Sequence, residues 1–261
     1  MPVILALSPH LDDAVFSVGA SILAAVEAGH RVVVCTVLAG DPPDSRSPAG
    51  RAFHRHCGLT DDDAVATRRA EDRAATALLR AEHRHLPLVD CLYRRVGDRW
   101  PYDRPGAASI PGWPAEPDLC AAIERHLGDL LDTLAPTEVW TCAAVGGHVD
   151  HRLVRAAAQR VCGPSLTLWE DIPYAYGTAP PAAEVTDAVR TTDRHLRSKL
   201  AAVAHYGSQV RGLWPDDPHW GDSMLAHAAG RRTLLGTAEP MWPAAALAAE
   251  PVPSSRGTER G

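Results

Sequence analysis

The sequence predicts an α/β fold with a mostly parallel sheet and helices on both faces. Short apolar runs, typical of buried strands, alternate along the chain with longer amphipathic segments, typical of helices. Such alternation favours parallel strands joined by crossover helices. The first three elements form one such unit: an apolar run over 3–7, a helix over 13–28 that ends before Gly29, and an apolar run over 31–37. The expected architecture is therefore Rossmann-like.

The rest of the chain continues the alternation. Residues 40–60 and 94–117 are rich in proline, glycine and polar residues, and we expect irregular segments there. The region 214–242 has a mixed pattern. We expect a single domain over residues 1–243 and a flexible tail over 244–261. The pattern predicts helices over 60–81, 118–134, 150–161 and 192–205, and strands over 86–89, 138–144 and 166–169.

Composition excludes several classes of function. The 261 residues are 46% hydrophobic, enough for a sizeable core, and the net charge of −6 includes no basic block, so we expect no nucleic-acid partner. No run approaches the roughly 20 apolar residues of a membrane span. The N-terminus lacks the cationic and apolar regions of a signal peptide, so we expect a cytoplasmic location. The six cysteines form no C-x-x-C pair and are expected to be reduced core thiols.

Two clusters of histidine and aspartate follow predicted strands. Residues 8–13 (SPHLDD) follow the first strand, and residues 146–151 (GGHVDH) follow the strand over 138–144. Because the carboxyl ends of parallel strands meet at one edge of a sheet, both clusters should reach one crevice. Imidazole nitrogens and carboxylate oxygens are good zinc ligands, and a catalytic zinc keeps about three of them. His10, Asp13 and His151 could supply those three.

Three further residues of the clusters could do chemistry beside a metal. The carboxylate of Asp12 could take a proton from water. His148 could stabilise an oxyanion or protonate a leaving amine, and Asp150 could orient its ring. Each cluster also has a simpler interpretation. Asp12 with Asp13 could be an N-cap pair, and residues 148–151 could form a solvated helix cap.

The clusters resemble the two signatures of a known family. Residues 9–13 (PHLDD) and 148–151 (HVDH) are similar, in order and spacing, to the signatures of the PIG-L/LmbE family of zinc N-deacetylases. Segments 68–71 (RRAE), 169–174 (WEDIPY) and 206–210 (YGSQV) are also similar to blocks of that family, so the resemblance covers roughly residues 3–210. Leu11 departs from the proline of many members, at a position that is not a ligand.

The resemblance implies roles for individual residues. It implies that His10, Asp13 and His151 bind Zn²⁺. It further implies that Asp12 is the general base, and that His148 is the acid or oxyanion stabiliser, tuned by Asp150.

The resemblance also implies two substrate contacts. These are Arg68 and Asp90, the latter directly after the predicted third strand. Arg69 could take the place of Arg68 through a shift of one residue.

The function implied is that of a zinc-dependent hydrolase that removes the N-acetyl group of an N-acetylglucosamine-type amino sugar. The GGHVDH and WEDIPY blocks resemble the actinobacterial branch that acts on natural products, including glycopeptide antibiotics. The expected partner is a small amino sugar or glycosylated natural product; the oligomeric state stays open. One alternative is an amidase that cleaves a larger thiol–sugar conjugate. Another is a magnesium phosphotransferase that uses Asp12, although magnesium prefers oxygen ligands to histidine.

Other segments carry weaker expectations. The loop over 40–58 leaves a strand near the proposed metal and could act as a lid. At least one tryptophan from proline-containing segments should line the crevice, because aromatic faces stack on sugars. The tryptophans considered are Trp100, Trp113, Trp214 and Trp220.

The histidines of segments 54–56 and 83–85 are expected on solvated faces. Residues 206–209 could either close the site or form a helix C-cap.

Overall fold

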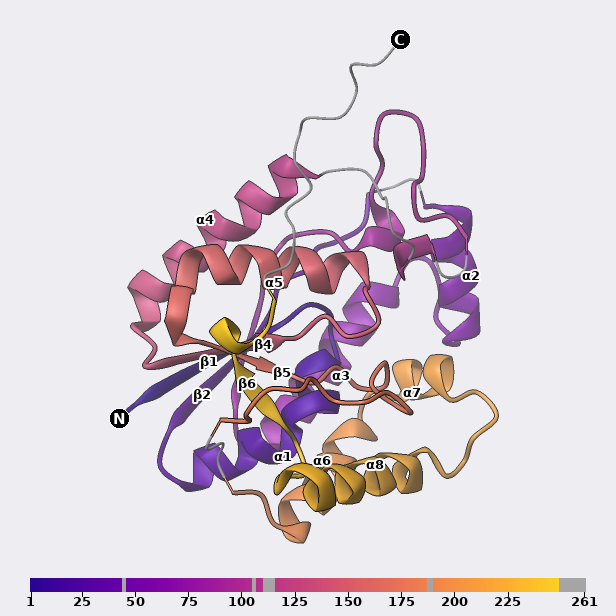
Figure 1. The fold of residues 1–261 in the computed structure, drawn as a ribbon. Helices are drawn as coiled ribbons and strands as arrows, with labels where there is room; N and C mark the ends of the chain where they lie inside the picture. The colour runs from indigo at the N-terminus through magenta and orange to yellow at the C-terminus, as the bar shows by residue number, and fades with distance from the viewer. Residues whose placement is uncertain (44–45, 105–106, 110–115, 187–189, 249–261) are drawn as a thin grey trace.

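The computed structural model describes residues 1–43, 46–104, 107–109, 116–186 and 190–248. A six-stranded sheet in the order β3-β2-β1-β4-β5-β6 forms its centre (Figure 1). The first five strands run parallel, and β6 pairs antiparallel with β5. The strands are β1 (Val3–Ser8), β2 (Arg31–Thr36), β3 (Glu82–His85), β4 (Glu138–Cys142), β5 (Leu166–Trp169) and β6 (Met241–Pro243).

Helices cover both faces of the sheet, as Figure 1 shows. On one face α1, α3 and α6 pack through residues such as Phe16 and Val203, and on the other α4 and α5 pack through residues such as Leu127 and Leu153. The predicted fold class is therefore confirmed. Among the described residues the α-helices are α1 (Asp13–Glu27), α2 (Pro48–His56), α3 (Ala64–Leu78), α4 (Pro117–Leu134), α5 (Val149–Cys162), α6 (Asp193–Val203), α7 (Gly207–Leu213) and α8 (Trp220–Leu235).

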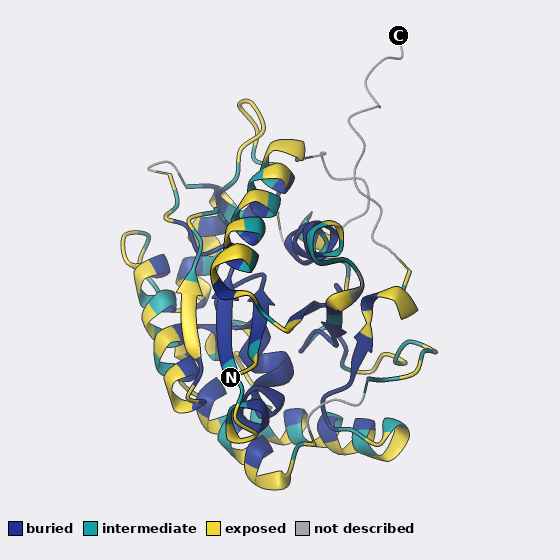
Figure 2. Ribbon diagram, turned by 90° about the vertical axis from the view of Figure 1, so that its left-hand side faces the viewer, coloured by how far each residue is buried: buried dark blue, intermediate teal, exposed yellow. Residues whose placement is uncertain are grey.

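The central strand β1 explains why its sequence is a continuous apolar run. Successive side chains of a strand point to opposite faces. Ile4 and Ala6 accordingly belong to the core beneath α1, whereas Leu5 and Leu7 belong to the core beneath α4 and α5. Both faces of the strand are covered, so no position is left for a solvated polar residue. The strands at the centre of Figure 2 are correspondingly dark blue.

The order of the strands creates a crevice beside β1. From β1 the chain passes to α1 on one face of the sheet, and from β4 it passes to α5 on the other face. The loops that leave these two neighbouring strands therefore diverge. In open α/β sheets this switch point, at the carboxyl ends of the strands, is where ligands bind. Both histidine–aspartate clusters lie there.

The prediction of the third strand was wrong. We expected residues 86–89, but β3 is Glu82–His85, a polar segment at the edge of the sheet. It is largely exposed, as the yellow strand in Figure 2 shows, so its sequence needs no apolar run. The apolar residues that follow extend beyond the sheet, where the backbone N–H of Gly40 donates to the carbonyl of Leu88 at 2.7 Å.

The segment 40–60 is not simply a loop. It contains α2, which begins after Ser47. The hydroxyl of Ser47 accepts a hydrogen bond from the N–H of Gly50 at 2.8 Å, and Pro48 occupies the first turn, where its missing N–H costs nothing. The glycines and prolines around Ser47 obscure this capping signal in the sequence. The corrected view is a helix, not a loop, beside the site.

The C-terminal region contains α8 and β6, which the mixed pattern did not resolve. Residues 244–246 form a short 3₁₀ helix in which Ala244 is buried, and residues 249–261 of the expected tail lie outside the described part of the chain. That residues 1–243 form a single domain stays a prediction. No helix among the described residues combines the length and apolarity needed to cross a bilayer.

Candidate active site

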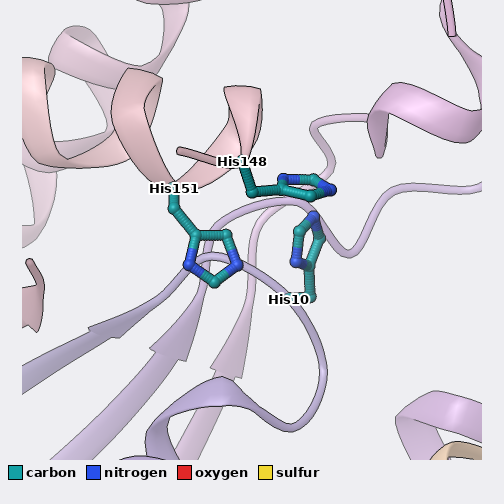
Figure 3. A group of neighbouring side chains, drawn as sticks. All are labelled: His10, His148 and His151. Atoms are coloured by element: carbon teal, nitrogen blue, oxygen red, sulfur yellow. The ribbon is translucent and has the colours of Figure 1, made fainter. Parts of the chain in front are cut away.

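Three histidines face one another at the switch point of the sheet. His10 lies on the loop after β1, and His148 and His151 lie at the N-terminus of α5. Figure 3 shows their rings turned toward a common centre. The centroids of His10 and His148 are 5.0 Å apart, those of His10 and His151 5.3 Å, and those of His148 and His151 5.1 Å. The two sequence clusters thus form one site.

The carboxylate of Asp13 joins two of these rings. Its Oδ2 lies 3.2 Å from Nδ1 of His10 and 3.3 Å from Nε2 of His151. All three side chains are buried, and Nε2 of His151 has no hydrogen-bond partner among the described residues. Two imidazole nitrogens and one carboxylate oxygen that converge in this way could hold a divalent cation. The three predicted ligands are therefore brought together, and their donor set fits zinc.

Each of the two rings has a second carboxylate on its far side. Nε2 of His10 lies 2.9 Å from Oδ2 of Asp150, and Nδ1 of His151 lies 2.7 Å from Oδ1 of Asp171. Carboxylates in this position fix the orientation and tautomer of metal-binding histidines. With a metal bound, the nitrogen that faces Asp13 would thereby be the one without a proton in each ring. Asp171, to which we had assigned no role, completes this arrangement.

His148 differs from the other two histidines. Burial, and then the positive charges of His10 and His151, lower the pKa of His148 to about 3, so its ring is neutral. Its Nδ1 accepts a hydrogen bond from the backbone N–H of Asp150 at 3.3 Å, which leaves the ring proton on Nε2. Although the three histidines lie close enough to share an ion, His148 is therefore suited to donate a hydrogen bond rather than to bind metal.

Asp150 contacts His148 only through its backbone in this arrangement. Its carboxylate lies instead against His10 and is 2.6 Å from Nη2 of Arg94. The opposite charge of Arg94 and the contact with His10 outweigh burial and hold the pKa of Asp150 well below its usual range. The carboxylate is thus ionised beside a proposed ligand.

Asp12 faces the cavity and does not cap α1. It precedes the helix, but its side chain makes no capping hydrogen bond. Burial, and then the charge of Asp13, raise the pKa of Asp12 to about 7, against the opposing charge of Arg68. A carboxyl with such a pKa can take and return a proton near neutral pH. The N-cap interpretation thus does not hold for Asp12, whereas His148 does cap α5 through its ring.

The two expected substrate contacts lie together on the cavity wall. Nη1 of Arg68 is 3.6 Å from Oδ2 of Asp90, and the same oxygen is 3.8 Å from Nε2 of His10. Arg69 points elsewhere, with Nε donating to the carbonyl of Ala39 at 2.7 Å. Of the two neighbouring arginines, Arg68 is therefore the one that a ligand could reach.

A cavity of about 780 Å³ opens over these polar groups. The remainder of its wall is largely apolar or aromatic and comes mostly from α1, α2, α7 and the loop after β5: Phe16, Ala52, Phe53, Ile172, Pro173 and Leu213. The expectation that a tryptophan lines the crevice is not met among the described lining residues. Trp214 packs instead on Phe16, with 5.7 Å between ring centroids, and Trp113 lies outside the described residues.

Tyr174 closes the wall beside the histidines. Its ring meets that of His151 edge-on, with centroids 5.4 Å apart. The approach requires glycine at position 146, where φ is +85° and a Cβ atom would lie 2.8 Å from the Tyr174 ring. Gly146, the first of the two glycines before the HVDH segment, thus makes room for an aromatic wall.

Two weaker expectations are also decided by the structure. His54 is buried, with Nδ1 2.6 Å from Asp61 and Nε2 2.7 Å from the hydroxyl of Tyr93, so the prediction of a solvated face was wrong for it. Residues 206–209 do not end a helix but begin α7. Gln209 from this segment lines the cavity, which therefore closes partly from that side.

A family model described as "PIG-L: GlcNAc-PI de-N-acetylase" matches residues 5–162. The match includes both histidine–aspartate clusters and more than half of the chain. This chain belongs to the PIG-L family. The membership confirms the resemblance inferred from the sequence.

Two relatives have names that state a deacetylase activity. The chain is 32% identical to 2'-N-acetylparomamine deacetylase of Streptomyces fradiae over 176 residues, which cover 66% of this chain and 57% of that enzyme. It thus spans little more than half of that relative. It is 29% identical to the enzyme of the same name from Niallia circulans over 240 residues, with 81% of this chain and 82% of that one covered.

Solved structures give a longer match. The crystal structure of the zinc-inhibited form of teicoplanin deacetylase is 34% identical, with a TM-score of 0.81 over 92% of this chain and 97% of that one. The A40926 pseudoaglycone deacetylase is also 34% identical, with a TM-score of 0.74 over 92% and 96% of the two chains. The PIG-L architecture therefore extends through the C-terminal region that the family model leaves out.

Two functional candidates escaped the sequence analysis of this PIG-L member. Asp171 follows the strand over 166–169, so the rule that pointed to the other strand ends could have found it. Arg94 lies in a segment rich in proline and glycine, where no local signal indicates that its guanidinium reaches Asp150.

Proposed function

We propose that the protein is a zinc-dependent hydrolase that removes the N-acetyl group from an N-acetylglucosamine-type amino sugar on a natural product. One observation carries the proposal: His10 and His151 turn one nitrogen each toward Asp13, and His10, Asp13, the Asp12 carboxyl and His148 all line one cavity. This combination supplies ligands, a base and a hydrogen-bond donor for amide hydrolysis. The four similar proteins described above are each named as a deacetylase, which supports the same reaction.

His10, Asp13 and His151 would hold the zinc ion. When bound there, zinc would lower the pKa of a water molecule and polarise the acetyl carbonyl. Asp150 and Asp171 orient the two ligating rings from behind. Because two of the three donors are imidazole nitrogens, the site suits zinc better than magnesium, and the phosphotransferase interpretation loses its support.

Asp12 would act as the base and then as the acid. Its carboxyl lines the cavity and has a pKa of about 7, raised chiefly by burial. It takes a proton from the attacking water and returns it to the amide nitrogen as the C–N bond breaks, so that acetate and a free amine leave.

His148 would stabilise the oxyanion that forms on the acetyl carbon. Its neutral ring carries the proton on Nε2, as its contact with the Asp150 backbone requires. A neutral imidazole is a poor proton donor to a leaving amine but a good hydrogen-bond donor to an oxyanion. The sequence left two roles open for His148: to protonate the leaving amine or to stabilise the oxyanion. The geometry favours the second role.

The cavity suggests what carries the sugar. Arg68 and Asp90 offer polar partners for sugar hydroxyls close to the histidines. Beyond them the wall is apolar, with Phe53 stacked over the Arg68 guanidinium at 5.6 Å. A volume of about 780 Å³ exceeds the need of one monosaccharide. The geometry therefore favours an amino sugar attached to a bulky, partly aromatic scaffold.

The proposal is tested by acetate release. Purified protein of measured metal content is incubated with free N-acetylglucosamine, 2'-N-acetylparomamine, a thiol–sugar conjugate of N-acetylglucosamine with inositol, and an N-acetylglucosaminyl glycopeptide pseudoaglycone. We expect acetate from a natural-product member, loss of turnover with a chelator, and recovery with zinc. A zinc-loaded protein that releases another acid from the thiol conjugate would favour the amidase alternative. Protein that neither contains nor responds to zinc would contradict the central claim.

A further inference from the structure

Arg94 is a buried arginine beside the candidate metal centre. Its side chain is only 9% exposed, and its Nη2 lies 2.6 Å from Oδ1 of Asp150, a carboxylate with no exposed surface. Nη1 donates to the carbonyl of Val89 at 3.1 Å. Burial of a guanidinium is costly unless its N–H groups are paired, so this position is held by specific partners.

The partners on its other side are Glu116 and Tyr102, and of these Tyr102 lines the cavity. Nε of Arg94 donates to Oε2 of Glu116 at 2.6 Å, and Nη2 donates to Oε1 at 3.0 Å. The hydroxyl of Tyr102 donates to the same Oε1 at 2.7 Å, and the Tyr102 ring lies 5.4 Å from the guanidinium. Glu116 and Tyr102 thus fix the fork of Arg94, the planar set of N–H donors of its guanidinium, in one orientation.

The carboxylate of Asp150 connects this fork to the ligands. While Oδ1 faces Arg94, Oδ2 accepts from the backbone N–H of Cys91 at 3.0 Å and lies 2.9 Å from Nε2 of His10. The opposite nitrogen of the same ring faces Asp13. A displacement of the carboxylate would therefore rotate the ring and move that nitrogen.

We propose that Arg94 is a positioning residue for the metal centre, which holds His10 in its ligating orientation through Asp150. The proposal rests on the metal site proposed above. Partners of this kind, one contact removed from the metal, typically change metal affinity by about 10- to 100-fold when they are lost. Glu116 acts in the same chain, one contact further away.

The charge of Arg94 alone would have the opposite effect. A cation close to the site repels a second cation, so its removal should strengthen metal binding if charge were all that mattered. If Arg94 only stabilised the fold, its loss should lower stability and leave metal affinity unchanged. A positioning role is the one that predicts weaker binding after a positive charge is removed.

The experiment measures zinc affinity of metal-free full-length protein by competition with a chromophoric chelator. We compare the wild type with Arg94→Met, which removes charge and fork, and Arg94→Lys, which keeps the charge but cannot reproduce the fork. Both should bind zinc about 10- to 100-fold more weakly. Arg231→Met is the matched control, because Arg231 is also a buried arginine paired with a buried glutamate, at 2.7 Å from Glu170, and has no contact with the three ligands among the described residues. It should lose stability and keep its zinc affinity.

The outcomes separate this proposal from the proposed function. If the wild-type protein does not bind zinc, the proposed metal site itself is contradicted. Unchanged or tighter binding by folded Arg94→Met, with a normal wild type, would overturn only the role of Arg94. Should that variant not fold, Glu116→Gln replaces it, since it loosens the fork and keeps the guanidinium. It should weaken zinc binding in the same direction, and unchanged affinity would overturn the proposal.

Discussion

The carboxylate of Asp171 lies 2.7 Å from Nδ1 of His151, on the side of the ring that faces away from Asp13. Its other oxygen accepts from the backbone N–H of Val145 at 3.0 Å, which fixes the carboxylate itself. The end of β5 and the loop after β4 are thereby connected through one side chain. His151 owes its orientation toward Asp13 to this contact.

We therefore expect Asp171→Asn to weaken zinc binding by about 10- to 100-fold, because the amide can no longer hold the ring in one tautomer as a carboxylate does. Competition with a chelator measures the change. Asp72→Asn is the matched control, since Asp72 is also buried and lies 2.7 Å from a histidine, His85, and has no hydrogen bond or ion pair with the proposed ligands among the described residues. If Asp171→Asn binds zinc as tightly as Asp72→Asn, Asp171 does not position His151 for metal binding.

Asp12→Asn should retain zinc and lose most of its turnover. The amide cannot take a proton from water, and removal of a positioned base typically lowers kcat by about 10²- to 10⁴-fold. The measurement pairs initial rates of acetate release with metal content of the same sample. Asp63→Asn serves as control, because Asp63 also precedes a helix without a side-chain cap but lines no part of the cavity. If Asp12→Asn hydrolyses at the wild-type rate, another group is the base.

The meeting of the two clusters could be predicted from the sequence because its signals are local. His10 and Asp13 lie three positions apart in the sequence, as do His148 and His151, and each pair lies in the loop or helix start after a strand whose apolar pattern is strong. Two strand-end clusters and the rule for parallel sheets then suffice to bring them together. The family resemblance rests on the same local segments.

The misplaced elements depend on contacts that a local pattern does not contain. β3 lies at the sheet edge, where exposure removes the need for apolar residues, so the apolar run beyond it was taken for the strand. α2 was obscured by the prolines and glycines around its cap. Arg94 reaches Asp150 across 56 positions of the chain, with α4 and β4 between them, and no spacing rule predicts that pairing.

The apolar wall formed by α2 should select for the scaffold that carries the sugar. Ala52 lines the cavity from an exposed helix position, so Ala52→Trp can fill space there without disturbing the core. We expect kcat/KM for a bulky glycosylated natural product to fall roughly ten- to a hundred-fold, the range that overpacking a binding surface by 1–3 kcal/mol produces. The value for a small N-acetylglucosamine substrate should change little.

Arg55→Trp is the control for this substitution, because Arg55 is exposed on the same helix but does not line the cavity. Zinc content should match the wild type in both variants. An equal loss for large and small substrates in Ala52→Trp would mean that α2 does not contact the scaffold.

The ion pair of Glu170 with Arg231 should make stability depend on pH. Burial alone would raise the pKa of Glu170, but hydrogen bonds and charge from His227 and Arg231 lower it below its usual range. Because the folded pKa is the lower one, the pair stabilises the protein fully above the unfolded value of about 4.3 and loses its contribution as pH falls through the folded pKa. Glu170→Gln leaves Arg231 buried without its counter-charge and should lower the free energy of unfolding by roughly 3 kcal/mol at pH 7. In urea titrations the difference in free energy of unfolding from the wild type should shrink at pH 3.

Glu82→Gln, which breaks a half-exposed pair with Arg31, is the control and should cost less than about 1 kcal/mol at either pH. A Glu170→Gln deficit that is as large at pH 3 as at pH 7 would show that the side chain stabilises the fold by packing and not by its charge.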